Sequence, residues 1–346
     1  VLPPAALGRI DVPVLGRAGI PTTGVTAVAL NVTGICAQAD NYLTVWPSGL
    51  TQPAFAAAVN VAARATRGTF VTPAVGNGGR VSIATGALSD VVVDVRGYWT
   101  TAATAHPHTS IPPVRVYDSR KDPRGPLGAG EARPVALPSL AGTPSTLLSS
   151  ATLNVLGTGA AAPGRISVAP VDAAPYSSVV VQLAPGETIA NRTVTALRSG
   201  GFVVRSSAPG THVVIDAVGF TARASVAPRA ESFTPVVSTR LLDTRTVGAP
   251  ATASARARFV VVGRAGIPSG VRAVAMTVTS IDATSATSVT AWPSGTARPA
   301  TTDLRMEPGQ VRRNLVIAQV GRDGRVLVAP SAGSTAVLVD AVGYYR

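Results

Sequence analysis

Apolar and polar residues alternate with a period of two over much of the chain, as in β-strands that bury one face. In the last third of the sequence this alternation predicts strands at 239–243, 257–262, 271–280, 287–292, 302–306, 313–320, 324–329 and 335–342. The Ala-rich segment 55–65 could form a helix, but Phe55, Ala57, Val59 and Val61 alternate there too, so we predict a strand. The 34 glycines and 28 prolines favour short strands joined by turns.

The same pattern occurs three times along the chain. The segment Val-Val-Val-Asp-Val-Arg-Gly-Tyr at 91–98 returns in similar form at 213–220 and 337–344. The aspartates of these segments are 216−94 = 122 and 340−216 = 124 residues apart. Trp-Pro-Ser-Gly at 46–49 also returns at 292–295, although the middle copy has Ala169 in place of the tryptophan. Agreement of several motifs in order and spacing indicates tandem repeats.

We therefore predict an all-β protein of three tandem repeats, at 1–100, 112–222 and 235–346. About eight strands in each repeat suit a β-sandwich or jelly-roll-like unit. Segments 100–112 and 221–235, rich in Thr, Ala and Pro, are expected to be linkers. Three units in a row is the favoured arrangement. The alternative is one pseudo-threefold assembly in which the repeats share a core.

The first repeat is expected to lack its opening strand. Repeats two and three begin with Arg-Val-Tyr-Asp-Ser-Arg at 115–120 and Arg-Leu-Leu-Asp-Thr-Arg at 240–245, and repeat one has no such segment. Either truncation removed this strand, or the open edge accepts a strand from another chain. The second reading would allow self-association through repeat one.

Composition excludes several classes of protein. The net charge of +13 comes from scattered arginines without a recognised nucleic-acid-binding module, so we expect no specific nucleic-acid partner. No apolar run reaches the roughly 20 residues that span a membrane. Cys36 is the only cysteine, which excludes an intrachain disulfide and a cysteine-cluster metal site. We expect Cys36 to be buried.

The motif set Arg-Leu-Leu-Asp-Thr-Arg, Gly-Ile-Pro, Leu-Asn-Val-Thr, Trp-Pro-Ser-Gly and Val-Asp-Ala-Val-Gly-Tyr-Tyr resembles a tandem repeat of exported actinobacterial proteins. That repeat occurs alone or beside hydrolase domains such as cell-wall amidases. The resemblance implies a secreted protein at the cell surface, and it brings no established activity with it.

Two sets of residues are candidates for special roles. In an apolar strand a carboxylate needs a partner, so Asp94, Asp216 and Asp340 are predicted to form structural ion pairs with arginines of the opening strands, Arg115 and Arg240. Trp46 and Trp292, with Tyr42 nearby, could form a face that stacks on sugars. Aromatic packing beside the Pro-Ser-Gly turn is the favoured reading of these rings.

No catalytic residue, metal site or cofactor is predicted. The acids stand singly, whereas Ca²⁺ needs several clustered oxygen ligands. His106, His108 and His212 do not recur between repeats, and no nucleophile motif is present. The sequence thus favours a non-enzymatic, extracellular structural or adhesive surface protein, with self-assembly as one option. The alternative is a carbohydrate- or cell-wall-binding module that accompanies a secreted hydrolase.

Overall fold

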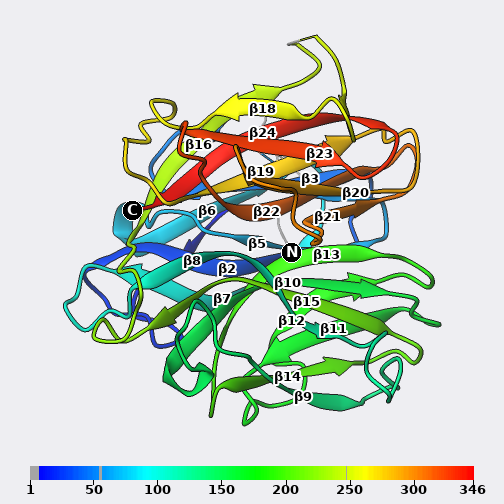
Figure 1. The fold of residues 1–346 in the computed structure, drawn as a ribbon, viewed down its shortest axis with the longest axis horizontal. Helices are drawn as coiled ribbons and strands as arrows, with labels where there is room; N and C mark the ends of the chain where they lie inside the picture. The colour runs from blue at the N-terminus through cyan, green and yellow to red at the C-terminus, as the bar shows by residue number, and fades with distance from the viewer. Residues whose placement is uncertain (1–7, 54–56, 247) are drawn as a thin grey trace.

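The computed structural model describes residues 8–53, 57–246 and 248–346. These residues form antiparallel β-strands and two short 3₁₀ segments, η1 (Asn77–Gly79) and η2 (Ser145–Leu147), and they contain no α-helix (Figure 1). In this part of the chain, no helix has the length and apolar character needed to cross a membrane. The prediction of an all-β protein is confirmed.

Repeat one forms two sheets, with strand orders β1-β6-β3-β4 and β5-β2-β7. Its strands are β1 (Arg9–Pro13), β2 (Val25–Ile35), β3 (Asn41–Pro47), β4 (Ala57–Val61), β5 (Thr66–Val71), β6 (Arg80–Thr85) and β7 (Asp90–Thr100). The strand predicted in the Ala-rich segment is present as β4, while Phe55 lies outside the described residues.

Repeat two also forms two sheets, β13-β10-β15-β8 and β12-β11-β14-β9. Its strands are β8 (His108–Asp118), β9 (Ala132–Ala136), β10 (Leu148–Thr158), β11 (Gly164–Ala169), β12 (Val179–Leu183), β13 (Ile189–Ala196), β14 (Gly201–Ser206) and β15 (His212–Ala222). The first residues of β8 fall inside the segment expected to be a linker.

Repeat three forms the sheets β16-β24-β19-β22 and β18-β23-β20-β21, with β17 paired to β24. Its strands are β16 (Phe233–Asp243), β17 (Ala251–Thr252), β18 (Ala257–Val260), β19 (Ala273–Ile281), β20 (Thr287–Pro293), β21 (Leu304–Met306), β22 (Val311–Gln319), β23 (Arg325–Pro330) and β24 (Ser334–Tyr345). Every strand predicted in this third of the chain is present.

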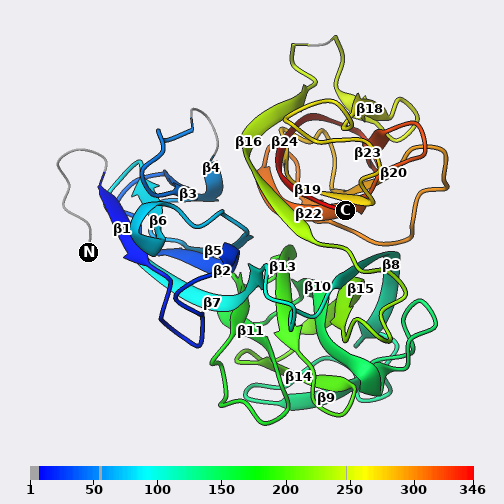
Figure 2. The same ribbon diagram turned by 90° about the vertical axis from the view of Figure 1, so that its left-hand side faces the viewer.

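The prediction of three sandwich-like units in a row is wrong. The described residues form six small antiparallel sheets that lie as a ring around a common centre (Figure 2). The strands β5, β13 and β22, one from each repeat, contact one another at this centre. Apolar side chains such as Phe70 and Leu315 meet there in a cluster shared between repeats. A repeat alone would leave these side chains in water, so burying them requires the neighbouring repeats.

Two further expectations concern repeat one. Cys36 is exposed, contrary to the prediction, because it lies in the turn that follows β2 rather than in the core. The sheet β5-β2-β7 has three strands among the described residues, whereas its counterparts in repeats two and three contain a fourth strand, β8 or β16, beside β15 or β24. In the described residues, β2 is the only strand paired with β7.

Candidate functional site: the interfaces between repeats

Two equivalent asparagine pairs join the repeats. Asn191 of β13 donates from Nδ2 to Oδ1 of Asn31 in repeat one at 3.3 Å, and Asn31 donates to the carbonyl of Val179 at 3.2 Å. The next interface repeats this geometry, since Asn314 of β22 donates to Oδ1 of Asn154 at 3.1 Å. All four amides are buried. Buried amides that satisfy one another fix the register between neighbouring repeats.

Buried charges join the same surfaces. The Arg192 side chain is fully buried, and its Nη2 lies 3.0 Å from Oδ1 of Asp303 in repeat three. Glu187 of repeat two binds Arg67 of repeat one and, at 2.7 Å, Arg312 of repeat three. One carboxylate therefore links all three repeats. Sequence reasoning missed these residues, although the single charged residue Arg192 within the alternating segment 189–194 was a signal of unusual burial.

The candidate Arg–Asp pairs join the opening and closing strands of repeats two and three. Arg115 contacts Asp216 in repeat two, and Arg240 Nε donates to Asp340 Oδ1 at 2.5 Å in repeat three. Each arginine also binds an acid three residues further along its own strand, Asp118 or Asp243, at 3.1 Å. In each case the carboxylates of two strands share one guanidinium, which ties the opening strand to the closing strand of its repeat.

Asp94, the third aspartate, has a different environment. It is half-buried, and this burial raises the pKa of its carboxyl above the usual value, against the opposing charge of Arg96. In the described part of the chain no ion pair forms at Asp94. Arg96 instead enters repeat two, where its Nη2 donates to Thr193 Oγ1 at 2.6 Å and to the Val168 carbonyl at 3.2 Å.

The three candidate aromatic residues do not form one exposed face. Trp46 and Trp292 are only 3% and 1% exposed, and they lie in different repeats, on β3 and β20. Trp46 Nε1 donates to the Leu50 carbonyl at 3.0 Å, which closes the turn after β3. Tyr42 is 43% exposed and is the only one of the three with a ring open to solvent.

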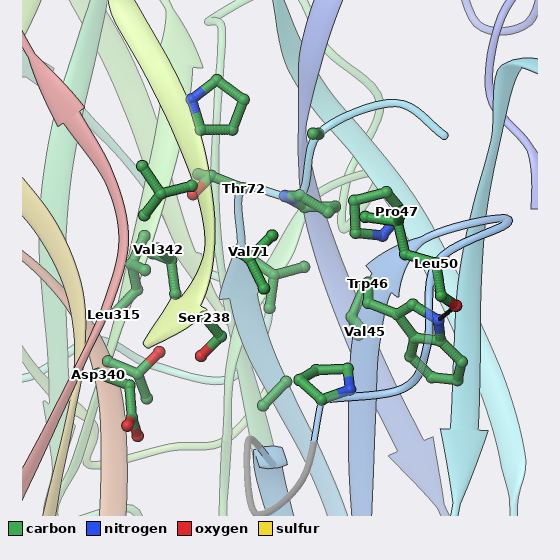
Figure 3. Close-up of a pocket in the computed structure, with 18 of the residues that line it drawn as sticks. Val45, Trp46, Pro47, Leu50, Val71, Thr72, Ser238, Leu315, Asp340 and Val342 are labelled. Atoms are coloured by element: carbon green, nitrogen blue, oxygen red, sulfur yellow. Dashed lines mark hydrogen bonds between the residues drawn. The ribbon is translucent and has the colours of Figure 1, made fainter. Parts of the chain in front are cut away.

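A pocket of about 190 Å³ lies beside Trp46, between repeats one and three (Figure 3). Its walls are mainly apolar, with Leu50 and Val71 from repeat one facing Leu315 and Val342 from repeat three. The carboxylate of Asp340 also lines it, but this group is already paired with Arg240. The pocket therefore offers shape and apolar surface to a small ligand rather than acid–base chemistry.

The pocket has a physical origin in the repeat pattern. Val342 precedes Gly343 in β24 as Arg96 precedes Gly97 in β7, so the two side chains hold equivalent positions. Arg96 extends to the Val168 carbonyl across the interface of repeats one and two. The shorter Val342 leaves space at the interface of repeats three and one, where Val45 lines the pocket.

The described residues hold no cluster of three or more metal-binding side chains. His108 is buried, stacks on Tyr345 with ring centroids 4.3 Å apart, and lies 3.5 Å from Glu231. His212 Nδ1 lies 3.1 Å from Ser119 Oγ. These two histidines have neighbours at interfaces and strand ends and do not converge on one site.

Comparison with known proteins gives no family. No family model matches the chain, and no curated protein matches it. Among solved structures, a triple jelly-roll protein from the turret of an archaeal virus is 10% identical, with 99% of this chain and 84% of that chain covered and a TM-score of 0.21. A tandem CBM22 domain of Xyn10C from Paenibacillus barcinonensis is 11% identical, covers 70% of this chain and 99% of that chain, and has a TM-score of 0.19. These scores are low, so function has to be argued from the residues of the chain itself.

Proposed function

We propose that this chain is a non-enzymatic structural or adhesive protein of the cell exterior, a rigid block made of three interlocked repeats. The observation that carries the proposal is the set of buried polar contacts between repeats. Asn31 with Asn191, Asn154 with Asn314, and Arg192 with Asp303 each cross an interface.

Such contacts suit a load-bearing or spacing element. Satisfied polar networks in a buried interface hold one relative orientation, because any rotation leaves donors or charges without partners. Repeats that only swing on linkers need no such network. The resemblance of the motifs to repeats of exported proteins supports a location outside the cell.

A carbohydrate- or cell-wall-binding module is the second candidate, and the pocket beside Trp46 is the observation in its favour. Leu50 at its rim is 50% exposed, and Tyr42 presents an exposed ring on the same strand as Trp46. A sugar-binding role would use Tyr42 and the pocket rim, since the Trp46 ring itself is buried.

Two measurements test the proposal. Protease treatment of intact source cells should remove the protein, and purified protein should show no saturable retention on insoluble peptidoglycan. Intracellular retention would contradict the exterior location. Glycan retention that falls in Tyr42→Ala or Leu50→Ala, with thermal stability unchanged, would favour the binding module instead.

A further inference from the structure

The outer edge of β7 is open where its two counterparts are covered. Asp94 lies opposite Asn31 of β2, as Asp216 lies opposite Asn154 and Asp340 opposite Thr277. On their other sides, Asp216 faces Arg115 of β8, and Asp340 faces Arg240 of β16. The described residues place no strand in that position beside β7.

Side-chain exposure along β7 reflects this open edge. Val92 is 43% exposed, whereas the equivalent residues Val214 and Leu338 are 4% and 6% exposed. These two are covered by the opening strands, since Val214 pairs with Asp118 and Leu338 pairs with Asp243. Tyr98 near the other end of β7 is 41% exposed. An apolar strand edge of this kind is a template for pairing with another chain.

A groove of about 710 Å³ continues this edge, where repeats one and two meet the start of β16 in repeat three. It is lined by residues 96–100 of β7, by Ser150 and Thr152 of β10 and by Phe233 of β16. At the interface of repeats two and three the opening strand fills the matching space, where Gln319 of β22 donates to the Ser110 carbonyl of β8 at 3.0 Å.

We infer that β7 and this groove accept an extended strand from a second polypeptide that carries the pattern Arg-x-x-Asp-(Ser/Thr)-Arg. The strand runs antiparallel to β7, and its first arginine binds Asp94. Its apolar residue two positions after that arginine faces Val93, as Leu242 faces Val339 in repeat three. The inference concerns an assembly partner, and it holds whether the ring serves as a structural block or as a glycan-binding module.

Charge and occupancy argue against pairing with a second copy of residues 8–346. Within these residues, the two segments with the required pattern are already paired, in β8 and β16. Direct pairing of two β7 edges would bring the half-buried Asp94 carboxylates of both copies together without a cation. An incoming arginine instead gives Asp94 the partner that its counterparts have.

The test uses the intact protein and a labelled synthetic peptide with the sequence of residues 233–245 of this chain. We expect saturable binding by fluorescence anisotropy and slower hydrogen exchange over residues 90–100. Loss of the charged hydrogen bond, by Asp94→Asn in the protein or Arg240→Ala in the peptide, should weaken binding by about tenfold.

Asp282→Asn is the matched control, because it removes the same charge from an exposed turn of repeat three. It should leave peptide affinity unchanged, and thermal melting should show that both protein variants are folded. Absence of saturable binding up to millimolar peptide would overturn the inference. Slower hydrogen exchange only outside β7, or equal peptide affinity of the wild type and the Asp94→Asn variant, would also overturn it. Dimerisation of the chain alone that is abolished by Val92→Lys would also overturn it, in favour of self-pairing.

Discussion

The buried pair of Arg192 and Asp303 allows a quantitative test of the interface between repeats two and three. Arg192 Nη2 lies 3.0 Å from Asp303 Oδ1, and Arg192 Nε donates to the Leu315 carbonyl at 3.2 Å. Asp303 Oδ2 also accepts from the Ala291 amide at 2.9 Å. Asp303→Ala leaves the guanidinium buried without its anion, so the free energy of unfolding should fall by about 3–5 kcal/mol.

The double variant Arg192→Leu/Asp303→Ala should recover most of this loss. The positions equivalent to Arg192 are occupied by Phe70 in repeat one and by Leu315 in repeat three. The ring centre therefore already accommodates apolar side chains at these positions. Replacing a buried ion pair by apolar residues of fitting shape is often neutral or stabilising. The double variant is thus expected within about 1 kcal/mol of the wild type.

Urea unfolding followed by tryptophan fluorescence measures these differences, with the two single variants and the double variant forming a mutant cycle. Hydrogen exchange of β13 and β21 shows whether the loss is local to the interface. If Asp303→Ala lowers the free energy of unfolding by less than about 1 kcal/mol, the pair is not the energetic link described. The same holds if the loss in the double variant equals the sum of the losses in the two single variants, because the two side chains are then not coupled.

Further predictions test the opening strand, a close backbone approach within repeat one and the buried tryptophan. The side-chain hydrogen bond from Arg120 lowers the pKa of Asp118 to about 2, so the stability this carboxylate contributes is present above its unfolded pKa of about 4 and is lost as the pH falls toward 2. Asp118→Asn should therefore cost about 1–2 kcal/mol near neutral pH and almost nothing at pH 2 in urea unfolding. Gly76→Ala should destabilise the protein by about 2 kcal/mol or more, because its Cβ would lie 2.1 Å from a backbone atom of the neighbouring turn, whereas at Gly97 the nearest atom is 3.9 Å away and alanine should be tolerated in a thermal melt. Trp46→Ala should lower the free energy of unfolding by about 3–5 kcal/mol, as expected for a buried ring, and equal stability of this variant would show that the ring does not pack as described.

The sequence by itself determined the local structure of this protein. Period-two alternation predicts strands here, and the glycines and prolines mark where the strands end. Central strands such as β2 and β15 are nevertheless buried on both faces over most of their length. The spacing of Asp94, Asp216 and Asp340 established the repeats. Even the Ala-rich segment 55–65 could be assigned to a strand, because Phe55, Ala57, Val59 and Val61 alternate with the residues between them.

Only the tertiary structure decided how the repeats meet. Arg192 and Asp303 belong to different repeats and are 111 residues apart, so no local pattern identifies them as partners. Their contact depends on the rotation of one repeat against the next, which is set by the summed packing of many side chains at the centre of the ring. The burial of Trp46 and the exposure of Val92 follow from the same geometry, because each depends on which neighbouring strand covers the residue and not on the residue itself.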